Sequence, residues 1–390
     1  MLGGVRSGLE RVGVVLCSIL ALQSVLAPAV PTRVTGPWSV VMAASYRAGE
    51  AGLYAYAPSA ISAGGSTYYF TCHNTVPGVI RDSVWMAEVR DDRVVREQAV
   101  LAPSQAGWDS HHVCDPSVVA GRFGFAGRTF GYAMFYLGTP ADNTDNQIGV
   151  AFADDLAGPW TRSPAPLIAI PDSAAPLWGV GEPSAVTLNA STGSVELFYT
   201  DGTAGTAPYR RHLVLGTTGW QIGDPVPVTE AGLGGDVLRN FDVAYDVRRD
   251  EFYLAREAGP YPTAAPANIS SIVEVDSMPA AALWSGTGAW QVEGRITPAV
   301  TSLARNHNPG ILRTLDGNLP DDGDLAIIVT GAAMGAFPAV LSSYDLWTVT
   351  RRLPDVSEAP RRNPRDRGAP SLGDWVRVAA DVDPVPADPA

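Results

Sequence analysis

The sequence predicts an all-β fold built from repeated units, and three observations support this prediction. The chain of 390 residues contains 40 Gly and 32 Pro, which interrupt it too often for long helices. Hydrophobic residues make up 46% of the chain and include 10 Trp, enough to bury a large core. A short pattern also recurs: an entry marked by Pro or Asp, an apolar strand, a turn and an aromatic-rich strand.

The recurring pattern predicts how the repeats are arranged. The five entries are Ala57-Pro58, Asp115-Pro116, Glu182-Pro183, Phe241-Asp242 and Asn308-Pro309. The first three prolines are 58 and 67 residues apart, and 126 residues separate the third from the last, with Asp242 near the middle. Such spacing is typical of a repeat array. Because stacked repeats bury faces that one repeat leaves open, we predict a five-bladed β-propeller with blades of about four antiparallel strands.

The N-terminal segment predicts export from the cell. Arg6 and Arg11 precede an apolar run from Val12 to Leu26, and small residues follow at Ala27 and Ala29. This pattern is typical of a secretory signal peptide, which we place at residues 1–29. The run is shorter than a membrane span usually is, so a retained anchor is the less favoured alternative. We therefore expect a secreted, extracellular protein that has no membrane contact after signal cleavage.

The propeller domain is predicted to cover residues 37–353. Trp38–Met42, ahead of the first repeat, can supply an outer strand to the last blade and so join the two ends of the domain. Residues 354–390 are rich in Pro, Arg and Asp with few large apolar side chains, which predicts a disordered C-terminal tail.

Charge and cysteine content narrow the partners and the compartment. The net charge is −13, and the Arg residues are scattered among Asp and Glu, so nucleic acid is not expected as a partner. Cys17 lies in the signal segment, which leaves Cys72 and Cys114 in the mature chain. Two cysteines in an oxidising compartment favour one disulfide, and two separate buried thiols are the alternative.

The repeat entries carry the candidate site. In a propeller these segments converge on the central channel, and here they bear Asp115, Glu182, Asp242 and the pair His307-Asn308. Polar residues before Pro also initiate turns, so each one alone has a structural explanation. Their recurrence at equivalent repeat positions favours a shared site.

These motifs resemble the five-bladed propeller glycosidases, especially glycoside hydrolase family 43 and its relatives acting on arabinofuranosyl, xylosyl and fructosyl residues. The resemblance rests on Asp115-Pro116-Ser117, Gly181-Glu182-Pro183, Ala151–Trp160 and His307, and it spans roughly residues 50–350. It implies that Glu182 is the general acid and that Asp115 tunes the acid and orients the sugar. It also implies a possible structural Ca²⁺ beside His307 in the channel, with no cofactor required for the reaction. A histidine that satisfies backbone carbonyls is the alternative for His307.

One departure from that family concerns the catalytic base. The family places an aspartate in blade one, where this chain has Tyr56-Ala57-Pro58. Inverting hydrolysis needs a second carboxylate to deprotonate water. Asp242 is our first candidate for this base, and Asp109 is the second.

Other polar and aromatic residues near the entries are candidates for binding the sugar. The segment Trp108–Asp115 contains two His and two Asp. Adjacent histidines on a strand face opposite sides, so at most one of them can serve a given site. We predict no metal in this segment. Trp residues that precede the entries can stack on a sugar ring or fill the core. The predicted substrate-binding residues are Trp108, Asp109, His111, His112, Trp178, Arg239, Asn240, His307 and Asn308.

Two functions remain after other chemistries are searched for. The sequence has no phosphate-binding Gly-rich loop, no Gly-x-Ser-x-Gly nucleophile elbow and no paired Cys-x-x-Cys motif. We expect a monomeric glycoside hydrolase that acts on furanoside- or pentoside-containing oligo- or polysaccharides, with Glu182, Asp115 and Asp242 as catalytic residues. The alternative is a noncatalytic propeller that binds a glycan or a cell-surface polymer in the same cleft.

Overall fold

The computed structural model describes residues 37–46, 53–74, 76, 80–141, 144–171, 177–234, 240–259, 269–332 and 344–355. All of them belong to the second of two compact units, which covers residues 34–390. The predicted signal peptide at residues 1–29 lies outside the described residues, as does the predicted tail beyond residue 355. Among the described residues, no helix has the length and apolar character to cross a membrane.

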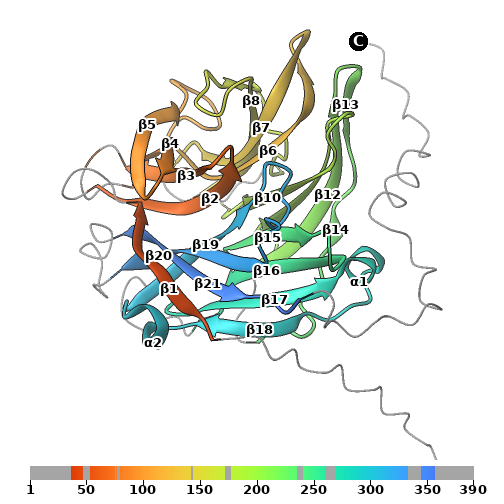
Figure 1. Cartoon of the computed structure of the whole chain (residues 1–390). Coiled ribbons are helices and arrows are strands. Elements are labelled where there is room, and N and C mark those ends of the chain that lie inside the picture. Colours follow the sequence, from red (N-terminus) through yellow and green to blue (C-terminus); the bar gives the residue numbers. More distant parts are fainter. Residues whose placement is uncertain are drawn as a thin grey trace, which may run out of the picture. The chain divides into compact units, whose positions relative to one another are not determined.

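The described chain is built from antiparallel strands, which confirms the all-β prediction (Figure 1). We call consecutive strands that pair with one another a group. Group 1 consists of β2 (Ala55–Ala63), β3 (Ser66–Asn74), β4 (Asp82–Arg90) and β5 (Arg93–Leu101). Group 2 consists of β6 (His112–Phe125), β7 (Arg128–Thr139), β8 (Gln147–Ala153) and β9 (Thr161–Arg162).

Groups 3 and 4 repeat this arrangement. Group 3 consists of β10 (Val180–Asn189), β11 (Ser194–Asp201), β12 (Ala207–Gly216) and β13 (Gly219–Ile222), with β14 (Val226–Pro227) also paired to β12. Group 4 consists of β15 (Phe241–Asp246), β16 (Glu251–Glu257), β17 (Val273–Pro279) and β18 (Gln291–Ile296). Two short helices flank β18, namely α1 (Ala280–Ser285) and α2 (Pro298–Thr301).

Group 5 joins the two ends of the domain. It consists of β19 (Arg305–Arg313), β20 (Asp324–Ala332) and β21 (Asp345–Arg352), with β1 (Ser39–Tyr46) paired antiparallel to β21. The predicted outer strand at Trp38–Met42 is therefore confirmed from Ser39 onward. A short parallel pairing of Leu312 with Ala60 connects β19 to β2, so groups 5 and 1 form one eight-stranded sheet. Gly310 permits this approach, because a Cβ there would lie 2.2 Å from the carbonyl oxygen of Pro58.

The hydrophobic core lies between neighbouring groups. Successive residues of the second strand of each group point to opposite faces of the sheet, and both faces are buried. Each cluster of buried hydrophobic side chains therefore contains residues from two neighbouring groups. Representative pairs are Phe70 with Met134, Phe135 with Leu197, Phe198 with Phe252, Tyr253 with Ile327, and Ile328 with Tyr69. Because the last pair joins group 5 to group 1, every described group packs against a neighbour on both faces.

In groups 1 to 4, a side-chain oxygen of the first strand accepts a hydrogen bond from the backbone of the next group's first strand. The Oγ of Ser59 accepts from Val118 N–H (3.3 Å), and the Oγ of Ser117 accepts from Ala185 N–H (2.9 Å). Ser184 Oγ accepts from Val243 N–H (2.9 Å), and Asp242 Oδ2 accepts from Ile311 N–H (2.8 Å). Each serine directly follows an entry proline, so these bonds fix the entries of neighbouring groups relative to one another.

Candidate active site

The repeat entries converge on one pocket, as the sequence predicted. It opens to solvent and is lined by Ala57, Pro58, Asp115, Pro116, Glu182, Pro183, Asn240, Phe241, Asp242, Asn308 and Pro309. Four lining residues precede a proline and have left-handed backbone angles: Ala57 (φ 49°), Asp115 (φ 46°), Glu182 (φ 54°) and Asn308 (φ 34°). A bulge at each of these positions interrupts strand pairing. Such a backbone turns the residue before the proline toward the pocket, and this costs conformational energy that functional sites commonly bear.

Glu182 is the pocket carboxylate best suited to act as an acid. It lies near the start of β10 and is half-buried at the pocket wall. Burial raises its pKa well above the ordinary value, and the negative charges of Asp115 and Glu257 raise it further. Such a setting favours the protonated form of a carboxyl group.

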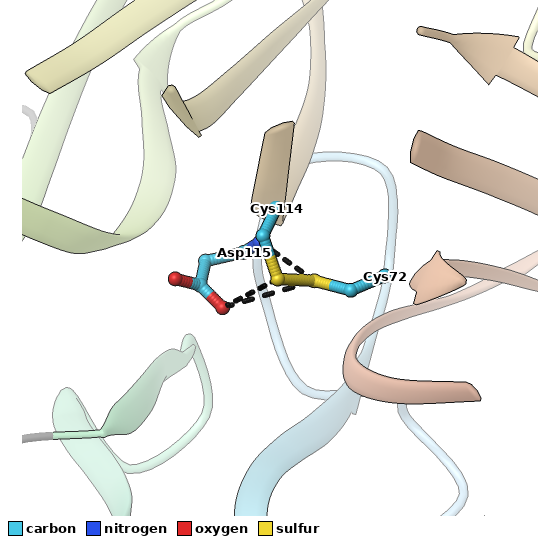
Figure 2. Close-up of side chains that lie close together, drawn as sticks. All are labelled: Cys72, Cys114 and Asp115. Carbon is cyan, nitrogen blue, oxygen red and sulfur yellow. Dashed lines mark hydrogen bonds between the residues drawn. A yellow bond between two sulfur atoms is a disulfide. The ribbon is translucent and has the colours of Figure 1, made fainter. Parts of the chain in front are cut away.

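Asp115 lies at the entry of group 2 beside the disulfide that joins groups 1 and 2 (Figure 2). Its N–H donates to Cys72 Sγ (3.0 Å), and its Oδ1 lies 3.3 Å from Cys114 Sγ. The structure thus confirms the Cys72–Cys114 bridge. Burial raises the pKa of Asp115 to about 7; the charge of His307 opposes this shift, and the charges of Asp82 and Glu257 add to it.

The sequence did not single out Glu257, which organises the opposite side of the site. Its Oε1 accepts from Asn308 N–H (3.0 Å) and Asn240 Nδ2 (2.9 Å), and it pairs with His307 Nδ1. Burial alone would raise its pKa, but the charge of His307 and these hydrogen bonds outweigh burial and lower it. The pKa of Glu257 is thus shifted in the opposite direction to the pKa values of Glu182 and Asp115. Glu257 is the last residue of β16, and because β16 pairs antiparallel to β15, it lies beside the group 4 entry. Counting residues back from the turn between these two strands could have located Glu257 in the sequence.

Asn308 presents an open hydrogen-bonding group to the pocket. The side chain is buried, and its Oδ1 has no hydrogen-bond partner among the described residues. A buried amide oxygen without a partner is costly unless a ligand satisfies it. The predicted assignment of Asn308 to substrate binding thus has a physical basis, as a hydroxyl of a ligand can donate to this oxygen.

The two candidate bases are both engaged in structural contacts. Asp242 lines the pocket, but Oδ1 accepts from Ser184 Oγ (2.6 Å), Oδ2 accepts from Ile311 N–H, and Arg313 Nη1 lies 3.3 Å away. Asp109 is buried within group 2, where it accepts from Tyr136 Oη (3.1 Å) and Arg162 Nη1 (2.5 Å). The oxygens of both carboxylates are therefore occupied by donors from the protein, which leaves neither of them free to orient a water molecule.

A second buried carboxylate that the sequence did not reveal lies behind the group 1 entry. Asp82 accepts hydrogen bonds from Tyr54 Oη (2.8 Å) and Tyr56 Oη (2.9 Å). Burial raises its pKa to about 7, although both tyrosine bonds lower it. Its N–H donates to His112 Nδ1 (3.0 Å), so this predicted sugar-binding histidine packs between groups 1 and 2.

The remaining predicted binding residues are divided between the pocket rim and the core. Trp178 is half-buried beside the Glu182 entry, where its ring lies against Gly202 and Gly181. Trp108 instead stacks on Tyr136, with 5.7 Å between ring centroids, and donates to Pro164 O, so its ring packs within group 2. His111 lies in the turn before β6, half-buried. Arg239 lies outside the described residues.

The channel residues do not fit the Ca²⁺ that the resemblance implied. His307 is already paired with Glu257, and the guanidinium of Arg313 occupies the channel beneath the pocket, among the oxygens a cation would need. Two further groups of potential ligands include Cys72 or Cys114, whose sulfur atoms are bonded to each other and so offer no thiolate. No step of the chemistry below involves a metal.

No protein-family model matches the chain, and no curated protein matches it. Solved structures do share its fold. An α-L-arabinofuranosidase from Podospora anserina, in complex with cellotriose, has a TM-score of 0.54 and 14% identity over 82% of this chain and 98% of its own. A family 117 glycoside hydrolase from Zobellia galactanivorans has a TM-score of 0.53 and 14% identity, covering 85% and 98% of the two chains. A thermostable family-43 glycoside hydrolase has a TM-score of 0.50 and 14% identity, covering 82% and 98%. At these identities the likeness establishes the fold, and the reaction has to be argued from the site.

Proposed function

We propose that the protein is a secreted, monomeric five-bladed β-propeller that hydrolyses glycosidic bonds in furanoside- or pentoside-containing glycans. The five strand groups are the blades in this proposal. Hydrophobic clusters between each group and the next, including groups 5 and 1, support a closed ring. The solved structures that share this fold include glycoside hydrolases, one of them complexed with an oligosaccharide.

The observation that carries the proposal is the position of Glu182 at the pocket wall, close to the carboxylates of Asp115 and Glu257. Its pKa is raised by burial and by the charges of Asp115 and Glu257, whereas that of Glu257 is lowered. Carboxyl groups whose pKa values are driven apart in one site are typical of acid and base assignments in glycosidases. In this reading Glu182 donates its proton to the leaving-group oxygen, and Asp115 keeps that proton available.

The rest of the pocket supplies groups that suit a sugar. Prolines from four entries provide an apolar lining beside the polar side chains. Asn308 Oδ1 accepts from a sugar hydroxyl, and Trp178 offers an aromatic face at the rim. The negative charge of Glu257 stabilises the positive charge that develops on the sugar ring in the transition state.

A second candidate function is a glycan-binding propeller without catalysis, and one observation favours it. Ala57 has the same backbone conformation as Asp115 and Glu182, but it places only a methyl group in the pocket. Asp242, the other carboxylate of the lining, is held by Ser184, Ile311 and Arg313. Hydrolysis without a free base would be slow, whereas binding does not need one.

Hydrolysis of aryl furanosides, aryl pentosides and plant or bacterial polysaccharides by the wild type and two variants tests the proposal. Glu182→Gln removes the acid and should lower kcat/KM by about 100-fold to 10,000-fold. Glu196→Gln is the matched control, because Glu196 is also buried but pairs with Arg210 (2.7 Å) on β12, outside the pocket. Equal activity of wild type and Glu182→Gln would contradict the assignment of the acid.

The variant Ala57→Asp separates the two functions. Aspartate tolerates the left-handed backbone at this position better than alanine does, so the exchange should be accepted. If the wild type binds a polymer but cleaves nothing, and Ala57→Asp cleaves it, the native protein is a receptor on a hydrolase scaffold. If the wild type is active and Ala57→Asp adds nothing, another group already activates water.

A further inference from the structure

Arg313 occupies the centre of the channel directly beneath the pocket. It is the last residue of β19, and its side chain is almost completely buried. The guanidinium lies level with Ser59, Ser117 and Ser184, each of which immediately follows an entry proline that lines the pocket. It thus lies one residue layer below the candidate active site.

The guanidinium contacts oxygen atoms from all four other groups. Nη2 donates to Ser59 Oγ of group 1 (3.4 Å) and to Ser117 Oγ of group 2 (3.2 Å). Nη1 contacts Ser184 Oγ (3.4 Å) and Ala185 O (3.1 Å) of group 3, and Val243 O (2.9 Å) and Asp242 Oδ1 (3.3 Å) of group 4. The planar guanidinium suits this task, since its five N–H bonds diverge toward several acceptors at once.

The three serine hydroxyls, and the second carboxylate oxygen of Asp242, also hold neighbouring groups together. Ser59, Ser117, Ser184 and Asp242 each accept a backbone N–H from the next group. Below them, three successive carbonyls at Leu315–Gly317 accept from Ala120 (2.7 Å), Thr187 (2.9 Å) and Tyr245 (3.1 Å) of groups 2, 3 and 4. This segment covers the channel beneath Arg313, so the guanidinium is enclosed.

We propose that Arg313 is the built-in cation of the channel and makes the ring of strand groups independent of a metal ion. Hydroxyl, carbonyl and carboxylate oxygens are the ligands that Ca²⁺ prefers, and here all six contact the guanidinium. A divalent cation among them would have to displace Arg313, because two positive charges within contact distance repel. This inference concerns the scaffold and does not depend on whether the pocket is catalytic.

Thermal unfolding with and without metal tests the proposal. The full-length protein should contain no stoichiometric calcium, and its Tm should be the same after EDTA dialysis and after addition of millimolar calcium chloride. Arg313→Met keeps the aliphatic volume but leaves the carboxylate of Asp242 buried without its cation, which should lower Tm by about 5 °C. Arg313→Lys keeps the charge with fewer donors, so its Tm should lie between those of the wild type and Arg313→Met. If Arg313→Met does not fold, the Tm of Arg313→Lys should still lie below that of the wild type.

Arg351→Met is the matched control. Arg351 is also buried, but it donates to Glu293 O and so joins only groups 4 and 5. Its loss should lower Tm less than Arg313→Met does. The proposal is overturned if calcium co-purifies with the wild type in stoichiometric amount, if EDTA lowers the wild-type Tm, or if Arg313→Met melts within 1 °C of the wild type.

Discussion

Removal of the Cys72–Cys114 disulfide should destabilise the protein by an amount that follows from the length of the loop it closes. The bridge joins β3 of group 1 to β6 of group 2, and the two cysteines are 42 residues apart in sequence. In the unfolded chain this cross-link removes the conformational freedom of that loop. The double variant Cys72→Ala/Cys114→Ala restores this freedom without placing a polar group in the core.

The expected magnitude comes from the loop-closure entropy. For a loop of 42 residues, the chain-entropy relation gives about 4 kcal/mol at 25 °C. Unfolding entropy scales at about 2.1 cal/mol/K per residue, so for a domain of this size the loss corresponds to a fall in Tm of about 6 °C. Asp115 also loses the sulfur that accepts its N–H, so the pocket entry of group 2 should loosen as well.

Urea unfolding, monitored by Trp fluorescence, measures the loss of unfolding free energy, and calorimetry measures the fall in Tm. A reductant should lower the stability of the wild type toward that of the double variant and should leave the double variant unchanged. If the double variant unfolds at the same urea concentration as the wild type, the bridge does not stabilise the protein by restricting the unfolded chain. A change in the urea slope alone would indicate a more compact unfolded state instead.

Four further predictions concern residues of the site. Activity on an aryl glycoside should fall as pH rises past the raised pKa of Glu182, because the acid loses its proton; a pH profile lacking that falling limb would contradict the role. The pKa of Asp115 is raised from 3.8 to about 7 in the folded protein, so the carboxyl group makes the Tm fall as pH rises from about 4 to about 7. Asp115→Asn should make this fall in Tm smaller. Asp242→Asn should lower Tm, because Arg313 and Ile311 N–H lose a charged acceptor; an unchanged Tm with lost activity would make Asp242 the base. Trp178→Ala should raise KM with little change in kcat if the ring only binds sugar, and loss of kcat at constant KM would argue against that.

Several features were predictable from the sequence because they depend on local patterns. Gly and Pro spacing, aromatic-rich strands and the repeated X-Pro entries depend on backbone preferences that single residues impose, so the all-β fold and the pocket-lining Asp115 and Glu182 could be predicted. The Cys72–Cys114 bridge followed from counting, since only two cysteines remain after the signal segment.

Tertiary structure decided the roles that depend on which groups meet across the channel. Asp242 was a reasonable base by its position, but Ser184, Ile311 and Arg313 hold its carboxylate, and all three belong to other strand groups. Glu257 and Asp82 lie in no motif. The importance of Glu257 comes from burial beside the charge of His307, and that of Asp82 from burial against Tyr54 and Tyr56. A pKa depends on distance and solvent exposure in three dimensions, whereas a sequence records only order along the chain. The sequence by itself therefore determined the repeated β-strand architecture and the residues at its entries. The folded arrangement decided which of those residues line the pocket and which hold neighbouring strand groups together.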